Sequence, residues 1–235
     1  MRKKLFYVFV FGIAFALIEA SVVMYLRALY YPEGFAFPLK IISPEIYTIE
    51  FFREIATMLM LLSIAWTCGK NFNLRIAFFV FVFGIWDIFY YVFLKIFLNW
   101  PSSLLTWDLL FLIPVAWVGP VLAPVLCSLT MLLMAGLIFY FQEKDDRMAL
   151  SVGEWCFILA GSFVIFLVFI YDYAKFLITG GFYRISDLFQ NQKFIDAVQN
   201  FIPQKFYWFP FFAGEILILT GLFLFFKKGK KLLAK

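Results

Sequence analysis

The stretch LLTWDLLFLIPVAWVGPVLAPVLCSLTMLLMAGLIFYF, residues 104–141, decides how many times this chain can cross a membrane. A transmembrane helix needs about 20 apolar residues, so the stretch is too long for one crossing and too short for two crossings with a turn. Pro114, Pro120 and Pro124 each lack a backbone N–H and disfavour a continuous helix. The stretch therefore predicts a proline-broken, re-entrant or interfacial half-helix over residues 104–118, followed by a full span that begins near Pro120.

The composition of the whole chain indicates a lipid bilayer as its surroundings. Hydrophobic residues make up 65% of the 235 residues, charged residues make up 15%, and the mean hydropathy is +0.93. Soluble domains have about 45–50% apolar and about 25% charged residues. The net charge of +5 does not indicate a nucleic-acid partner, because the basic residues cluster at the ends of apolar runs.

Five other apolar runs are long enough to cross a bilayer. With the span after Pro120 they predict one all-α domain, a polytopic membrane bundle of six transmembrane helices over about residues 5–29, 47–68, 74–98, 120–141, 155–177 and 207–226. The first run is too long for a signal peptide and lacks a small-residue cleavage site, so we expect it to be retained. Residues 186–202 have Ser186 as a candidate N-cap and spaced apolar residues, which predict an amphipathic helix on the outer surface.

The distribution of basic residues predicts the orientation in the membrane. With six spans and a cytoplasmic N-terminus, twelve of the twenty basic residues face the cytoplasm. These twelve are Arg2, Lys3, Lys4, Lys70, Arg75, Lys144, Arg147, Lys227, Lys228, Lys230, Lys231 and Lys235. A seventh span would place the lysine-rich C-terminal tail outside. We therefore expect a multi-pass plasma (inner) membrane protein with both termini in the cytoplasm.

The absence of histidine restricts the cofactors that the chain could hold. It removes the usual haem ligand and the Ser-His and Cys-His nucleophile systems. Cys68, Cys127 and Cys156 lie far apart, without the paired spacing of a metal or redox motif. Haem is disfavoured, which leaves a divalent cation held by carboxylates as the cofactor that these residues could bind.

Acidic residues within or beside the apolar spans are the strongest functional signal. On the six-span model all of them lie between the midplane and the outer face: Glu19, Glu50, Glu54, Asp87, Asp108, Asp172 and Glu215. A charge at the bilayer centre costs about 2.5–3.5 kcal/mol even on the most lenient scale. Their confinement to one half of the membrane indicates a shared role.

Helical spacing groups these acids with other polar residues, because residues three or four apart share one face of a helix. The stretch YTIEFFREIATM (47–58) carries one such stripe and WDIFYYVFLK (86–95) carries another. We expect the stripes to face one another across a polar chamber in the outer half of the bundle. The candidate cation ligands are Glu19, Glu50, Glu54 and Asp87, with Arg27, Arg53, Tyr90, Tyr91, Asp108 and Glu215 as supporting polar residues.

Arg53 sets the expected charge pairing, because arginine stays protonated in proteins. Glu50 and Glu54 on the same helix are its nearest partners, which would leave Glu19 and Asp87 without an obligatory cation. The alternative interpretation is that these charges form buried pairs that fix the helix register and do nothing else.

Four segments resemble an uncharacterised family of small polytopic bacterial membrane proteins. They are FFREIATMLMLL (51–62), FGIWDIFYYVFLK (83–95), NWPSSLLTWDLLFLIP (99–114) and GPVLAPV (119–125), and the similarity covers roughly residues 19–126. The family has no assigned activity, so the resemblance implies no catalytic residue.

Three functions fit a carboxylate chamber in the outer half of the bilayer. The first is a site that binds or conducts a cation or proton, beside a broken helix that exposes free carbonyls. The second is an enzyme that acts on a lipid or lipid-linked substrate at the outer leaflet, with paired carboxylates as acid and base or as oxygen ligands for a divalent ion. The third is an accessory subunit of a larger membrane complex, or a homo-oligomer, in which the charges pair between chains. We favour the first.

Overall fold

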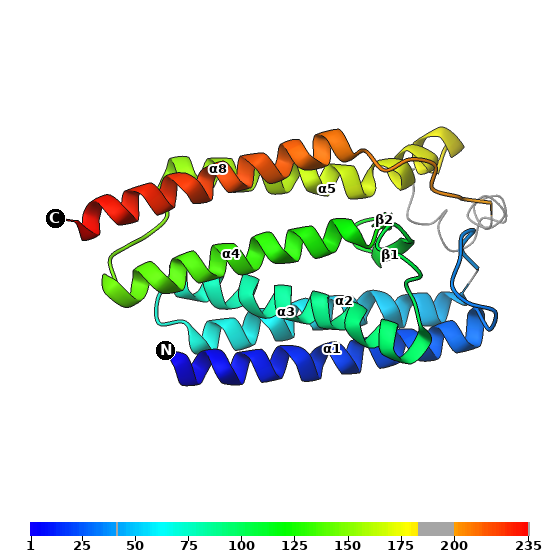
Figure 1. Cartoon of the computed structure of the whole chain (residues 1–235). Coiled ribbons are helices and arrows are strands. Elements are labelled where there is room, and N and C mark those ends of the chain that lie inside the picture. Colours follow the sequence, from blue (N-terminus) through cyan, green and yellow to red (C-terminus); the bar gives the residue numbers. More distant parts are fainter. Residues whose placement is uncertain (41, 183–199, 235) are drawn as a thin grey trace.

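The computed structural model describes residues 1–40, 42–182 and 200–234, and six long helices dominate this part of the chain (Figure 1). They are α1 (Arg2–Tyr30), α2 (Pro44–Cys68), α3 (Phe72–Leu98), α4 (Leu122–Lys144), α5 (Val152–Gly180) and α8 (Trp208–Leu233). All six are long and apolar enough to cross a membrane, which confirms the predicted six-helix, all-α bundle. The predicted surface helix over 186–202 falls almost entirely on residues 183–199, outside the described residues.

Polar caps explain why two helices begin a turn earlier than predicted. Ser43 precedes α2, and its hydroxyl accepts the backbone N–H of Ile46 at 3.4 Å. Ser151 precedes α5 and forms a capping box with Glu154, whose carboxylate accepts the Ser151 N–H at 2.6 Å. Such caps satisfy N–H groups that have no partner within the helix.

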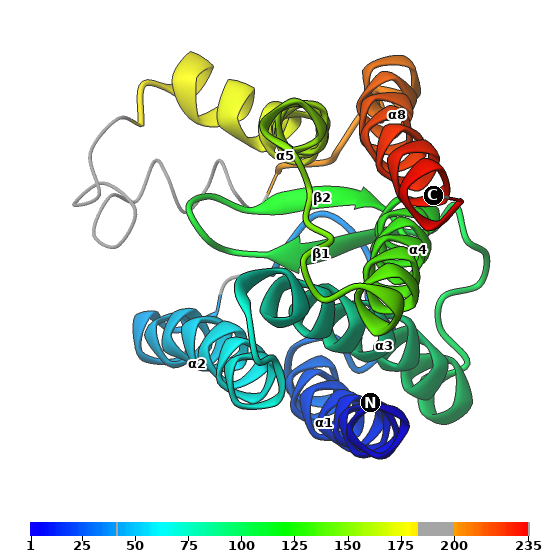
Figure 2. The same ribbon diagram turned by 90° about the vertical axis from the view of Figure 1, so that its left-hand side faces the viewer.

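Helices α1 to α3 form one group and α5 with α8 another, on opposite sides of a small hairpin, and α4 lies beside the hairpin between them (Figure 2). In the first group α1 and α2 pack on α3, and α3 packs on α4; in the second, α5 packs on α8, which also contacts α4. The α5–α8 contact is close, because a Cβ on Gly161 would lie 2.4 Å from the carbonyl oxygen of Gly214. Both termini lie at the same end of the bundle, which we call the termini end (Figure 1).

The expected half-helix over 104–118 is wrong: this segment is a β-hairpin. Strand β1 (Trp107–Phe111) pairs antiparallel with β2 (Trp117–Pro120), with Asp108 opposite Gly119. Pro114 lies in the turn between the strands, where its missing N–H breaks no strand pairing. Aromatic and β-branched residues favour extended backbone, and two paired strands satisfy donors and acceptors that a half-helix interrupted by proline would leave free. The predicted break before the fourth span is confirmed.

The hairpin is tolerated inside an apolar bundle because protein encloses it. Strands with open edges do not occur in contact with lipid hydrocarbon. Asp108 is 1% exposed and Val118 is also buried. On the β2 side, a Cβ on Gly119 would lie 3.0 Å from ring atoms of Phe169 and Phe206, so the strand packs tightly against α5 and the segment before α8.

Candidate functional site

A cavity of about 720 Å³ runs through the bundle between the two groups of helices. Side chains from all six helices and from the hairpin line it. All ten predicted site residues are among them: Glu19, Arg27, Glu50, Arg53, Glu54, Asp87, Tyr90, Tyr91, Asp108 and Glu215. Their role as cation ligands stays a prediction, and the contacts of each group define what the site could do.

Arg53 on α2 links two carboxylates from different helices. Its guanidinium donates to Glu19 on α1, and its Nε and Nη2 donate to Glu50 Oε2 at 2.9 and 2.8 Å. The predicted pairing of Arg53 with Glu50 is confirmed. Arg53 has no hydrogen bond to Glu54 among the described residues, and Glu19 from α1 takes that place. The expectation that Glu19 would lack a cationic partner is therefore wrong. Helical spacing could not show this, since it contains no information on which neighbouring helix approaches Arg53.

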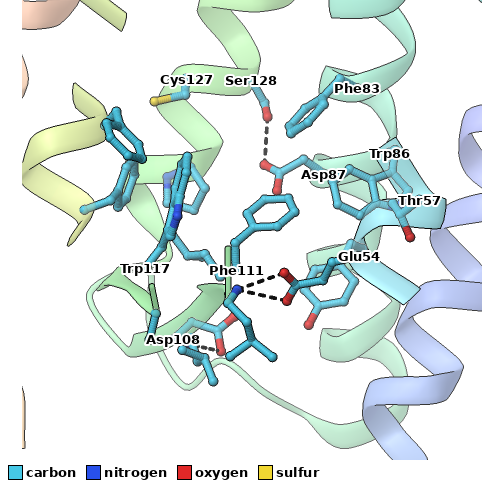
Figure 3. A pocket seen from close by; sticks show the side chains of 18 of the residues that line it. Glu54, Thr57, Phe83, Trp86, Asp87, Asp108, Phe111, Trp117, Cys127 and Ser128 are labelled. Atoms are coloured by element: carbon cyan, nitrogen blue, oxygen red, sulfur yellow. Dashed lines mark hydrogen bonds between the residues drawn. The ribbon is translucent and has the colours of Figure 1, made fainter. Parts of the chain in front are cut away.

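Glu54 instead contacts the backbone of the hairpin turn. Its Oε1 and Oε2 accept the N–H of Leu112 at 3.0 and 2.9 Å (Figure 3). Leu112 follows β1, so this N–H is a backbone donor at membrane depth that the strand pairing does not use. Glu54 therefore holds the hairpin against α2 and has a neutral donor, with no cationic side chain among its hydrogen-bond partners in the described residues.

Arg27 and Asp108 form the second ion pair of the cavity. Arg27 Nη2 donates to Asp108 Oδ1 at 3.0 Å, and the guanidinium lies over the rings of Phe35 and Trp100, 4.5 and 3.8 Å from their centroids. Tyr91 donates its hydroxyl to Asp108 Oδ2 at 3.2 Å. Burial raises the pKa of Asp108 above its ordinary value, and the Arg27 guanidinium opposes that rise. This cluster anchors β1 to α1 and α3.

Asp87 lies on α3 near the middle of the bundle and accepts a hydrogen bond from the Ser128 hydroxyl of α4 at 2.7 Å. Figure 3 shows its carboxyl group pointing toward Ser128, with Phe83, Trp86 and Phe111 around it. Asp87 has no salt bridge in the described part of the chain. The structure thus agrees with the expectation that Asp87 lacks a cationic partner.

Glu215 on α8 resembles Asp87 in its surroundings. It is 6% exposed, and its Oε2 accepts the hydroxyl of Thr130 on α4 at 2.7 Å. Its Oε1 is buried, with no N–H or O–H donor in hydrogen-bond distance among the described residues. Ser128 and Thr130 were not predicted as site residues. Serine and threonine within a helix often bond to their own backbone, so only tertiary structure reveals that these two serve carboxylates.

The carboxylates share a cavity without forming a metal cage. Among residues 1–40, 42–182 and 200–234, no group of three or more acidic or cysteine side chains is arranged to hold a metal ion. Glu19 and Glu50 are held by Arg53, Glu54 by a backbone N–H and Asp87 by a hydroxyl. Asp172, also noted in the sequence, has a buried oxygen without a partner in the described part of the chain, but it does not line the cavity.

The charges that line the cavity do not balance. Among the residues that the structure describes, six carboxylates line it against three cationic side chains: Arg27 and Arg53 on the helices, and Lys40 in the loop before α2. After both arginines are paired, Glu54, Asp87 and Glu215 keep only neutral donors. The chain is therefore a membrane-spanning helical protein with an excess of buried acidic groups.

No protein-family model, no curated protein and no solved structure matches this chain. Function is therefore inferred from the side chains themselves.

Proposed function

We propose that the protein binds a cation or a proton at the unpaired carboxylates of the cavity. The observation that carries this proposal is the imbalance, among the described residues, of six lining carboxylates against three cationic side chains, Arg27, Arg53 and Lys40. An ionised carboxylate in a low-dielectric interior is strongly unfavourable unless it is paired, and it takes up a proton or a cation instead. Glu54, Asp87 and Glu215 are the groups at which that neutralisation would occur.

A proton, or a cation that needs no cage of oxygen ligands, fits these groups better than a divalent metal ion. Calcium takes six to eight oxygen ligands and magnesium demands octahedral geometry. In the described part of the chain, Glu54, Asp87 and Glu215 are held by Leu112, Ser128 and Thr130 and do not gather into a metal-binding group.

The two ion pairs have a supporting role in this proposal. Arg53 joins α1 to α2, and Arg27 joins α1 to β1. They hold the helices and the hairpin around the cavity, which is the register-fixing role of buried charges. The unpaired carboxylates are then free to change their protonation or their ligand without loss of the fold.

The orientation belongs to the same proposal. The loop between α2 and α3 and the last turn of α4 lie at the termini end (Figure 1), and Lys70 and Lys144 lie there together with Leu232 and Leu233 from the end of α8. The clustering of basic residues at this end favours the cytoplasmic side of a plasma membrane. Lys40 would then face outward, and the acidic half of the cavity would lie toward the outer face.

Infrared spectroscopy tests the proposal on the protein in lipid nanodiscs. Spectra are recorded at a series of increasing pH values. At neutral pH they should show the carbonyl stretch of protonated carboxyl groups. The titratable groups that face Asp87 are Tyr90 and Tyr91 on α3, Asp108 on β1 and Cys127 on α4. The band should shrink in at least one of Asp87→Asn, Glu54→Gln and Glu215→Gln.

The control is Asp146→Asn, because Asp146 is exposed and pairs only with exposed Lys70 in the described residues. This variant should leave the protonated band unchanged. A wild-type protein with no such band at neutral pH, and no spectral response to added sodium or potassium, would contradict the proposal.

A further inference from the structure

The apolar part of the cavity is larger than binding of a proton requires. Toward the termini end, α3, α4 and α5 line the cavity with hydrocarbon and aromatic side chains and bring no charged group. These side chains include Phe79, Phe83, Met131, Met134, Ile158 and Phe166. The cavity therefore combines an acidic part with a long apolar part, as expected of a site for an organic molecule.

An aromatic wall connects the two parts. Trp86 and Phe83 pack with ring centroids 5.2 Å apart, and Phe111 lies 6.3 and 6.5 Å from them. Phe111 then contacts Trp117 at 5.5 Å, and Trp117 contacts Phe166 on α5 at 5.1 Å. Figure 3 shows Phe83, Trp86 and Phe111 beside Asp87. Aromatic faces attract cations within about 6 Å, most strongly where water is excluded.

The cavity is also open at the side. Leu159 on α5 lines it and yet is 61% exposed. Ser162, one turn further along α5, also lines the cavity and is exposed. A ligand dissolved in the hydrocarbon of the bilayer could enter there and reach the aromatic wall directly.

The charged side chains of the cavity favour a ligand with a positive charge over one with a negative charge. An anion would need a guanidinium whose charge is not already neutralised, but Arg27 pairs through Nη2 with Asp108 and lies over two rings, and Arg53 pairs with Glu19 and Glu50. Arg27 Nη1 is buried without an acceptor in the described residues, yet its charge is balanced by Asp108. A cation would meet carboxylates that have only neutral donors. Glu215 in addition has a buried oxygen without an N–H or O–H donor in the described part of the chain.

We infer that the cavity binds a lipophilic organic cation, a monovalent positive group attached to hydrocarbon or aromatic groups. The positive charge is recognised by Asp87 and Glu215 together with the aromatic wall, and the apolar groups pack toward Met134 and Phe166. This inference rests on the proposed function and names the class of ligand for the same carboxylates.

Two nearly isosteric ions of opposite charge, tetraphenylphosphonium and tetraphenylborate, test the inference. Binding of each to the purified protein in nanodiscs is measured by quenching of tryptophan fluorescence, with empty nanodiscs as the reference for partition into lipid. We expect saturable binding of tetraphenylphosphonium, and at least tenfold weaker binding of tetraphenylborate.

Matched variants locate the binding site. Asp87→Asn and Glu215→Gln should each weaken tetraphenylphosphonium binding about tenfold, whereas Asp146→Asn should not. Phe166→Ala should weaken it several-fold, whereas Phe163→Ala should not, because Phe163 is 59% exposed and does not line the cavity. Unchanged elution and thermal unfolding show that a variant is folded.

Equal binding of the two ions, or equal effects of the cavity variants and their controls, would overturn the inference. If the infrared band of protonated carboxyls is present and tetraphenylphosphonium still fails to bind, the ligand class is wrong while the proposed function stands. In the opposite case, tetraphenylphosphonium binds as expected, the carboxyl band is absent, and sodium and potassium do not change the spectrum. Binding of a proton or small cation is then wrong, while the site for an organic cation stands.

Discussion

The carboxyl group of Glu54 on α2 accepts the backbone N–H of Leu112, at 2.9 and 3.0 Å. An acidic side chain from one span therefore satisfies a backbone donor of the hairpin that lies between the spans. A buried N–H without an acceptor costs about 1–3 kcal/mol. This contact explains how non-helical backbone is stabilised at this depth, and it leads to the first prediction.

Replacement of Glu54 should separate its hydrogen-bonding role from its charge. Glu54→Gln keeps an oxygen for the Leu112 N–H and should change the free energy of unfolding little. Glu54→Ala leaves that N–H buried without an acceptor and should cost about 1–3 kcal/mol. Thermal unfolding in one detergent compares the two variants. Equal losses in both would mean that the charge, and not the hydrogen bond, stabilises the hairpin.

Replacement of Arg53 should be among the most destabilising changes in the cavity. Its side chain is 22% exposed, and Arg53→Met leaves Glu19 and Glu50 buried without their cation. Removal of one member of a buried ion pair costs about 3–5 kcal/mol. Much of this loss should be recovered when Glu19→Gln and Glu50→Gln are added to Arg53→Met. A triple variant as unstable as Arg53→Met alone would show that Arg53 acts through packing.

Asp87→Asn should leave the fold nearly unchanged, in contrast to Arg53→Met. The hydrogen bond to Asp87 comes from the Ser128 hydroxyl, and the amide oxygen of asparagine can accept it equally well. We expect a change below about 1 kcal/mol, the net value of a typical hydrogen bond. A thermal unfolding experiment that instead finds a loss of about 3–5 kcal/mol would assign Asp87 to a buried ion pair.

Two glycines should respond in opposite directions to alanine. A Cβ on Gly119 would press on Phe169 and Phe206 at 3.0 Å, so Gly119→Ala should cost about 1–3 kcal/mol through overpacking. Gly136 in α4 has open space at the same position, and Gly136→Ala should stabilise the helix by about 0.4–1 kcal/mol. Unfolding midpoints measure both. A neutral Gly119→Ala would indicate that β2 is free to move away from α5.

Cysteine labelling in whole cells tests the orientation. Single cysteines at Lys70 and Lys144 should react with a membrane-impermeant reagent only after the cells are opened, and a cysteine at Lys40 should react from outside. The native Cys68, Cys127 and Cys156 are first replaced by alanine. Labelling of positions 70 or 144 in intact cells would show that the protein has the opposite orientation in the membrane.

The sequence alone determined the number of spans and the residues that share the cavity. Six runs of about 20 apolar residues can satisfy their backbone N–H and C=O groups within a bilayer only by forming helices. Charged side chains in these helices are costly in contact with lipid, so they gather on faces turned away from it. These two constraints act locally, so composition and helical spacing were sufficient to find Glu19, Asp87 and the other acids that line the cavity.

Only the tertiary structure decided which groups pair. Helical spacing suggests Glu54 as a partner of Arg53, but the approach of α1 brings Glu19 there, and the hairpin gives Glu54 a backbone donor instead. The hairpin itself depends on enclosure by α2, α3 and α5, because its strands would be unstable in lipid without cover. Partner choice and hairpin formation are long-range effects, set by which helices become neighbours and not by the local pattern of residues.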